Sequence, residues 1–115
     1  YYEAGESSKA AGVAREALLL DESLAPAYTV LGAVALESRQ PEVALTELYR
    51  AITLDDGYGQ AYFYLGLAYR SLGQPAEATA AFERALAVAD DGVMRVRIRN
   101  HLRELYEGEK PGRTP

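Results

Sequence analysis

The sequence predicts an all-α fold built from stacked antiparallel helix pairs, and two observations support this prediction. The first is internal similarity at a fixed period of 34 residues: residues 25–58 and 59–92 share ten identical positions, where average residue usage gives about two. The second is the spacing of apolar residues, three and four apart in both halves of each copy, which is the period of a buried helix face. A repeat of this length indicates an array in which each helix pair buries its apolar face against the next.

The composition is that of an ordinary globular protein and excludes several classes of site. Of the 115 residues, 49% are hydrophobic and 25% charged, and abundant alanine with few β-branched residues favours helices. The chain has no cysteine, which excludes disulfides, a thiolate nucleophile and a cysteine zinc site, and the single histidine, His101, cannot form a histidine cluster. No apolar run approaches the ~18 residues that a membrane-spanning helix needs.

The net charge of −5 is unevenly distributed along the chain. Residues 1–92 carry 6 basic and 14 acidic groups, whereas residues 93–115 carry 6 basic and 3 acidic groups. Contacts to phosphates need clustered lysine and arginine, so an acidic body argues against nucleic acid as the partner.

Residues 1–24 are predicted to be the second half of a truncated repeat. Small and apolar residues recur at helical spacing over residues 7–20, and Ser7 or Ser8 would cap the start of this helix. Three alanines of its face align with the next repeat: Ala10 with Ala44, Ala14 with Leu48 and Ala17 with Ala51. The chain also starts without methionine, so we expect it to be a piece of a longer protein.

Residues 25–58 are predicted to form a complete helix pair. The first helix covers residues 25–38, and the second begins at Pro41 and ends near residue 54, before a turn of two aspartates and a glycine. Gly32 lies within the first helix, although glycine costs up to ~1 kcal/mol there relative to alanine. Because Gly66 occupies the same place one period later, we expect both glycines to permit a close helix contact where no Cβ fits.

Residues 59–92 follow the same plan, with helices over residues 59–72 and 76–89. Residues 93–107 are predicted to form a capping helix with charged outer faces, because its apolar residues recur at helical spacing: Met94, Ile98, Leu102, Leu105 and Tyr106. The domain then spans residues 1–107, and residues 108–115 are predicted to be a flexible tail.

The repeat itself resembles the tetratricopeptide repeat, whose 34-residue pattern is W-x2-L-G-x2-Y…A-x3-F…A…P. In residues 59–92 the pattern is carried by Tyr62 in place of Trp, Leu65, Gly66, Tyr69, Ala78, Phe82 and Ala85, with Asp90 in place of Pro. Residues 25–58 match through Tyr28, Leu31, Gly32, Ala44, Leu48 and Ala51, and depart from it at Ala35 and Asp56. The resemblance implies a right-handed superhelix of about two and a half repeats with a capping helix.

The resemblance also implies a concave groove, lined by the first helices of successive repeats, that binds a peptide of a partner protein. The predicted partner-binding residues lie beside the packing stripe of these helices: Thr29, Ala33, Leu36, Gln60, Phe63, Tyr64, Leu67, Arg70, Arg97 and His101. One subtype of the family holds a peptide carboxylate with Lys, Asn and Arg. The corresponding positions here are Thr29, Ala33, Tyr64 and Gln60, so that clamp is not predicted.

Phe63 is the leading candidate for partner binding, with two interpretations. Pointing into the groove, it would form an apolar patch with Leu67 and Tyr64 that suits a partner side chain. Alternatively, it packs on the next helix or on Met94. Arg70 and the arginines of the last helix also have two interpretations: they contact acidic groups of a partner, or they are solvated or paired with glutamates of that helix.

No catalytic constellation is found in the sequence. His101 has no Asp or Ser spaced beside it as in a triad, and the pairs Asp55-Asp56 and Asp90-Asp91 end helices at equivalent repeat positions, which indicates turn residues rather than metal ligands. We therefore predict no enzyme activity, no metal and no cofactor.

The function predicted from the sequence is a protein-interaction scaffold that binds a peptide of a partner protein. One alternative is self-association as a homodimer through the uncovered face of the first helix, with Ala10, Ala14 and Leu18 in the interface. A second alternative is a recruiting arm for an enzyme elsewhere in a longer chain. The sequence leaves the compartment open between the cytoplasm, which we favour, and the periplasm.

Overall fold

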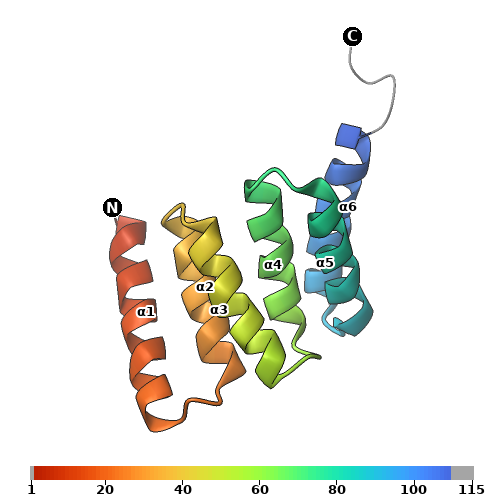
Figure 1. The fold of residues 1–115 in the computed structure, drawn as a ribbon. Helices are drawn as coiled ribbons and strands as arrows, with labels where there is room; N and C mark the ends of the chain where they lie inside the picture. Colours follow the sequence, from red (N-terminus) through yellow and green to blue (C-terminus); the bar gives the residue numbers. More distant parts are fainter. Residues whose placement is uncertain (1, 110–115) are drawn as a thin grey trace.

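The structure, a computed structural model, confirms the all-α fold. It describes residues 2–109, and the side chains of residues 6–108. Within this range the chain forms six helices and no strand (Figure 1). The helices are α1 Tyr2–Leu20, α2 Ala25–Glu37, α3 Pro41–Leu54, α4 Gly59–Ser71, α5 Pro75–Val88 and α6 Gly92–Glu109. None of the helices described is long and apolar enough to cross a membrane.

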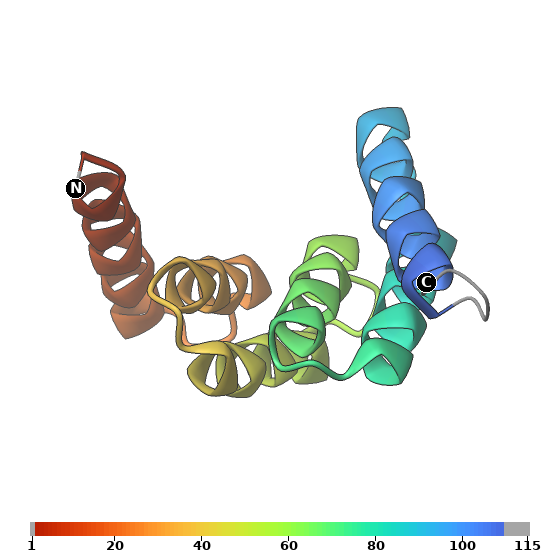
Figure 2. The same ribbon diagram turned by 90° about the horizontal axis from the view of Figure 1, so that it is seen from above.

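The helices stack side by side along an arc. Helix α2 packs mainly on α3, and α4 mainly on α5, while contacts of α4 with α3 and α2 join the two pairs. Seen from above, α2 and α4 lie on the inner side of the arc, α3 and α5 lie on the outer side, and α1 and α6 stand at its two ends (Figure 2). The first helix of each repeat therefore forms the floor of a concave face.

Both ends of the helical array extend further than the sequence predicts. Helix α1 begins at Tyr2, so Ser7 lies inside it and its hydroxyl donates to the carboxylate of Glu37; the prediction that Ser7 or Ser8 caps the helix is wrong. Helix α6 continues to Glu109, because the first strong helix breaker after it is Pro111. Residues 108–109 of the predicted tail are thus helical, and residues 110–115 lie outside the described part of the chain.

The aspartates at the helix ends are turn residues, as the sequence predicts. The carboxylate of Asp55 accepts a hydrogen bond from the backbone N–H of Gly57 at 3.1 Å, and that of Asp91 accepts one from Val93 at 3.1 Å. Side chains that bond to the backbone two residues ahead stabilise this kind of turn. Among the described residues, no three His, Asp or Glu side chains group as metal ligands.

The core is continuous across the repeats. Ala35, Leu48 and Leu65 belong to a buried cluster shared by α2 to α5, and a second cluster joins α4 and α5 to α6 through Phe63, Phe82 and Ile98. The core therefore continues beyond the α4–α5 pair into α6, because α6 covers the apolar face that α4 and α5 would otherwise expose.

The two glycines within helices make the close contacts that the sequence predicts. A Cβ built on Gly66 would lie 2.7 Å from the ring of Phe82, and one built on Gly32 would lie 2.7 Å from the side chain of Leu48. Phe82 and Leu48 are fully buried, so neither side chain has free space into which to move. The missing Cβ lets the two helices of each pair approach until the large side chain of the second helix rests on the backbone of the first.

The turns between paired helices each contain one residue with a left-handed backbone conformation, at equivalent repeat positions. Arg39 has φ 60° and Gly73, one period later, has φ 73°. In both turns the next residue donates a backbone hydrogen bond to the last helical turn, from Gln40 to Ala35 at 2.8 Å and from Gln74 to Tyr69 at 2.9 Å. This bond pattern closes a helix C-terminus, and glycine suits it because a Cβ is unfavourable there.

The first prediction concerns this turn. Replacing Arg39 with Gly should raise the free energy of unfolding by about 0.5–1 kcal/mol, because the relief of left-handed strain exceeds the entropy that glycine adds to the unfolded chain. Urea denaturation followed by circular dichroism measures the change. The matched control is Gly73→Ala, which should lower the free energy by a similar amount although no atom crowds that position. A destabilised R39G variant would contradict the assignment of strain.

The second prediction concerns the helix contact. Gly66→Ala should destabilise the fold by about 1–3 kcal/mol, because the new methyl group would displace the buried ring of Phe82, and Gly66→Leu should do so more strongly. Thermal denaturation measures the effect. Gly12→Ala in α1 is the matched control: no atom lies within 4 Å of its added Cβ, so alanine should stabilise the helix by up to ~1 kcal/mol. Equal melting temperatures for wild type and G66A would refute the packing role of Gly66.

Candidate binding groove

A pocket of about 520 Å³ lies on the concave face where α1, α2 and α4 meet. We call it the inner pocket. Its walls combine carboxylates, small apolar side chains and one aromatic ring, contributed by Glu6, Ser7, Ala10, Thr29, Val30, Ala33, Val34, Glu37, Gln60 and Tyr64. An apolar floor with a few polar groups at its edge is typical of a binding site.

Four of the ten predicted partner-binding residues lie together in the inner pocket: Thr29, Ala33, Gln60 and Tyr64. Thr29 is almost fully buried, and its hydroxyl donates to the backbone oxygen of Ala25 at 3.1 Å, so it shapes the floor of the pocket and offers little polar surface. Glu6, Ser7 and Glu37 were missed by sequence reasoning. Ser7 was assigned to a helix cap and Glu6 to no role, and the approach of both to α2 and α4 depends on how the helices stack.

Phe63 does not point into the groove, which corrects one of the two interpretations drawn from the sequence. Its side chain is only 3% exposed and packs against the ring of Phe82 at 5.9 Å and the ring of His101 at 5.6 Å between centroids. The alternative, packing on the next helix, is what the structure shows. The reason is that α6 crosses over this position and buries it.

The other predicted apolar candidates also contribute to the core. Leu36 is half-buried and packs on the cluster around Leu48, and Leu67 is half-buried and packs on the cluster around Phe63. Phe63, Leu67 and Tyr64 therefore do not form the predicted apolar patch. Phe63 and Leu67 belong to the core, and Tyr64 lines the inner pocket.

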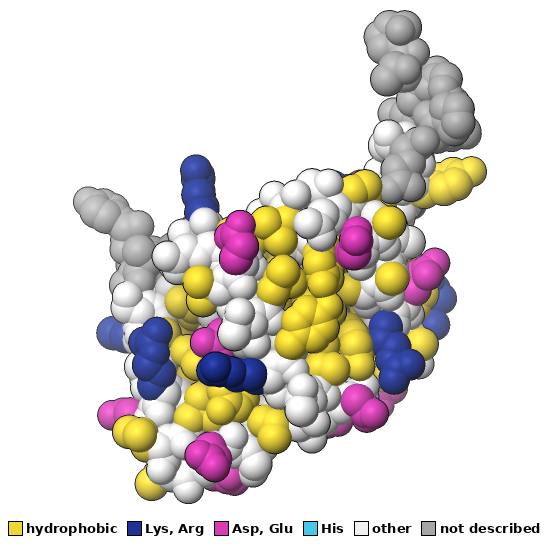
Figure 3. Space-filling view, viewed as in Figure 1, with side chains coloured by type: hydrophobic (Ala, Val, Ile, Leu, Met, Phe, Trp, Pro, Cys, Tyr) yellow, Lys and Arg dark blue, Asp and Glu magenta, His cyan; other side chains and the backbone are white. Residues whose placement is uncertain are grey.

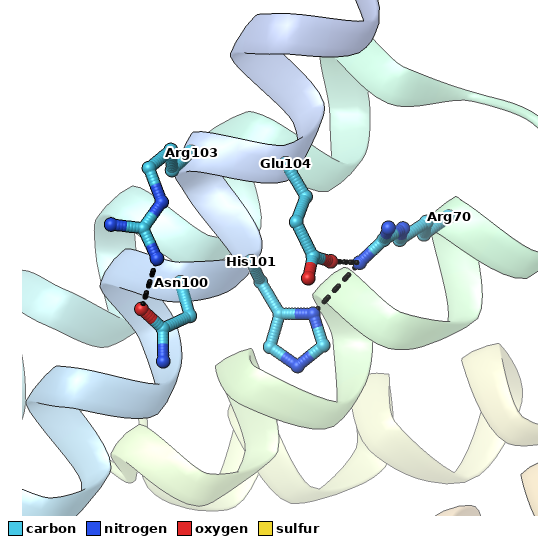
Figure 4. A network of polar contacts seen from close by, with 5 residues as sticks. All are labelled: Arg70, Asn100, His101, Arg103 and Glu104. Atoms are coloured by element: carbon cyan, nitrogen blue, oxygen red, sulfur yellow. Dashed lines mark hydrogen bonds and ion pairs between the residues drawn. The ribbon is translucent and has the colours of Figure 1, made fainter.

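Arg70 and His101 connect α4 to α6 (Figure 4). The guanidinium of Arg70 lies 2.8 Å from the carboxylate of Glu104 and 2.8 Å from Nδ1 of His101. Because arginine can only donate, Nδ1 of His101 accepts this bond and its proton resides on Nε2. Both predicted partner-binding side chains are thus engaged in holding the capping helix.

The ring of His101 is held between aromatic and charged groups. It stacks on Phe82, with ring centroids 5.1 Å apart and planes 8° from parallel. Partial burial, and then the positive charge of Arg70, lower the pKa of His101 below its ordinary value of 6.5, while Glu104 acts in the opposite direction and Arg97 adds a smaller lowering effect. A neutral imidazole is therefore favoured in the folded state.

Arg97 is a predicted candidate that keeps an exposed charge on α6. Its guanidinium carbon lies 5.5 Å from the centroid of the Phe63 ring, and the residue is exposed. Stacking on an aromatic face orients an arginine while leaving its N–H groups available to an acidic partner group.

A second, almost entirely apolar hollow of about 590 Å³ runs between α1 and α2. We call it the α1–α2 cleft. It is lined by Lys9, Ala10, Val13, Ala14, Ala17, Leu24, Pro26, Ala27 and Val30, and it shares Ala10 and Val30 with the inner pocket. Of the residues predicted for self-association, Ala10 is exposed, whereas Ala14 is buried and Leu18 half-buried against the body of the fold. Val13, 66% exposed, is the larger apolar group presented there.

The outer face differs in character from the groove. Figure 3 views this side, and hydrophobic side chains gather over its middle between dispersed basic and acidic groups. Tyr49 of α3 and Tyr69 of α4 share a hydrogen bond of 2.6 Å between their hydroxyls, and burial with this bond raises the pKa of Tyr49 to about 12. These side chains hold neighbouring repeats together.

The arc of antiparallel helices with a hollowed inner face defines the class of protein: an α-helical repeat protein. The family model of the tetratricopeptide repeat matches residues 59–91. This match confirms the resemblance found in the sequence, and this segment is a tetratricopeptide repeat. No curated protein sequence matches the chain.

Solved structures share the fold over almost the whole chain. The chain is similar to the first TPR of Spaghetti (RPAP3) bound to HSP90 peptide SRMEEVD, with 21% identity, coverage of 94% of this chain and 83% of that chain, and a TM-score of 0.79. The chain is 18% identical to the Yersinia enterocolitica type III secretion chaperone SycD, in complex with a peptide of the translocator YopD. The match covers 95% of this chain and 86% of that chain, with a TM-score of 0.81. MamA is 30% identical, with 94% of this chain and 61% of that chain covered and a TM-score of 0.77.

The third prediction follows from the lowered pKa of His101. Its pKa in the unfolded chain is higher than in the folded state, so the unfolded state takes up a proton first as the pH falls through about 6.5. The protonation of His101 should therefore leave the free energy of unfolding unchanged above this pH and lower it below this pH. Urea denaturation at pH 8 and pH 5 measures the difference; Glu104, whose pKa lies below its ordinary value of 4.5, stays ionised throughout.

The control for this prediction is His101→Phe, which keeps a ring on Phe82 and removes the titrating group. The difference in stability between the two pH values should be smaller in this variant than in wild type. An unchanged difference would show that other groups cause the pH dependence.

Proposed function

We propose that this chain is a protein-interaction scaffold that binds a peptide segment of a partner protein in its concave groove, with the inner pocket as the main contact. The observation that carries this proposal is the pocket itself: three helices from successive repeats converge on one hollow with an apolar floor and acceptor groups at its edge.

Two structures of the same fold support the proposal because they contain peptides. The RPAP3 domain is bound to an HSP90 peptide, and SycD is in complex with a peptide of YopD. The likeness to each concerns the fold, so the chemistry of the partner has to come from this chain's own residues.

The groove favours a peptide with a basic side chain at one end and an acidic group at the other. Glu6 and Glu37 line the inner pocket, so a lysine or arginine could extend its methylene stem along Ala33 and Val34 and place its charge beside the carboxylates. Arg97, exposed on α6 and stacked on Phe63, would contact an acidic group. Complementary charge of this kind determines orientation and selectivity.

We infer that the repeats act by binding rather than by catalysis. His101, the one histidine of the sequence, is engaged with Arg70 and stacked on Phe82, which suits a structural role and not that of a general base. A recruiting arm for an enzyme encoded elsewhere in a longer chain stays a prediction, and it would use the same groove.

The fourth prediction tests the groove. Random peptides displayed on phage are selected on the immobilised chain, and the affinity of each enriched peptide is measured by fluorescence anisotropy. Ala33→Arg should weaken binding about tenfold or more, because the long side chain would fill the inner pocket and oppose a basic peptide residue. The control is Glu83→Arg, which introduces the same side chain with a larger charge change at an exposed position of α5 and should leave the affinity unchanged.

Failure to enrich any peptide, or enriched peptides that bind A33R as well as wild type, would contradict the proposal. Circular dichroism spectra of both variants should match that of wild type, which separates loss of binding from loss of fold.

A further inference from the structure

Helix α6 is attached to α4 and α5 by one narrow face. Of its described side chains, only Ile98 and Leu105 are buried, and both belong to the cluster that joins α6 to the α4–α5 pair. His101 lies three residues after Ile98 and four before Leu105, a spacing that places all three on the same helix face. A group that can take up a proton therefore lies at the centre of this apolar face.

The surroundings of His101 suit the neutral form of its ring. The guanidinium of Arg70 donates to Nδ1 across 2.8 Å, which requires a lone pair on that nitrogen. The ring stacks on Phe82, with centroids 5.1 Å apart, and its centroid lies 5.6 Å from that of Phe63. The side chain is partly buried, so a positive charge on the ring would lose part of its hydration.

The charged groups that act on His101 come from α4 and from α6 itself. Helix α4 contributes Arg70, and α6 contributes Arg97 and Glu104, whereas α5 presents the uncharged ring of Phe82. Glu104 is the one carboxylate among these groups, and it is already paired with Arg70 at 2.8 Å. A protonated His101 would therefore bring a third positive charge to a site that has a single negative one.

Protonation of His101 would turn its bond with Arg70 into a repulsive contact (Figure 4). Both nitrogens of an imidazolium carry hydrogen, so Nδ1 would change from acceptor to donor and face an N–H group of Arg70 across 2.8 Å. The hydrogen bond would be lost, and two positive charges would oppose each other at that distance. The face of Phe82 attracts a cation, which offsets part of the repulsion but restores no hydrogen bond. An imidazolium in water has none of these costs, so protonation favours a state in which α6 has left its site.

The start of α6 is attached by a contact that acid does not change. The guanidinium of Arg95 donates to the backbone oxygens of Leu86 and Ala89 at 2.9 and 3.1 Å. An arginine stays protonated at every pH used here, and a backbone oxygen does not titrate. The first turn of α6 therefore stays next to α5 when the contact around His101 is lost, and the part of the helix that follows Arg95 is the part that moves.

We propose that the contact of α6 with α4 and α5 is an acid-sensitive switch, in which protonation of His101 releases the part of α6 after Arg95 and uncovers the aromatic side chains of Phe63 and Phe82. The release takes up a proton, because the ring binds protons less readily in the docked helix than in water. The released fraction therefore increases as the pH falls below about 6.5, the ordinary pKa of histidine. This is a local opening of one helix, distinct from unfolding of the whole chain.

The fifth prediction measures this opening by hydrogen exchange on the 115-residue chain at pH 7.5 and pH 5.5, corrected for the intrinsic pH dependence of amide exchange. Protection of the amides of residues 96–109 should fall at pH 5.5 by up to about tenfold, the limit for one group with a pKa of about 6.5 in the released state. These amides exchange on release because an isolated helix of this length is marginal in water. Protection in α2 and α3, which lie away from α6 (Figure 2), should change by less than about twofold.

Two variants of His101 serve as controls. His101→Phe keeps a ring on Phe82, and His101→Gln keeps an oxygen that accepts from Arg70, but neither side chain titrates. Circular dichroism checks that each is folded, and the protection of α6 in each should be the same at both pH values. Equal protection of α6 in wild type at both pH values, a loss of protection in all helices together, or an acid response in the variants as large as in wild type would each overturn the proposal.

Discussion

The contact between a helix backbone and a large side chain of its partner helix determines the rest of this fold. Gly66 against Phe82 and Gly32 against Leu48 set how closely the two helices of each pair approach. At that separation, the flanking alanines Ala44, Ala51, Ala78 and Ala85 are fully buried, so the helix pairs become flat units that stack. The curvature of the stack then creates the concave face that carries the inner pocket (Figure 2).

Period and spacing predicted this part of the structure because the interactions lie within one repeat. The helix bounds agree within a few residues for α2 to α5, and both glycine contacts were expected from two glycines 34 residues apart. The extents of α1 and α6 were predicted less well. They depend on the terminal residues, where no second copy of the repeat is available for comparison.

The candidate site was predicted only in part because it depends on contacts between repeats. Thr29 and Phe63 occupy the same repeat position, and both are buried, Thr29 in the floor of the inner pocket and Phe63 against α6. A residue one step along the helix, Tyr64, reaches the pocket instead. Sequence reasoning assigned α2, α4 and α6 to the groove, whereas the inner pocket is lined by α1, α2 and α4. The rotation of each helix is determined by its neighbour, and α6 has a neighbour surface unlike those of the repeats.

The two sides of the last helix differ in their surroundings. On the side facing α4, the ion pair of Arg70 with Glu104 and the stacked ring of His101 hold α6 in place. On the other side it presents Val93, Val96 and its arginines. Arg70 and His101, which sequence reasoning assigned to a partner, are therefore used within the fold to hold the capping helix.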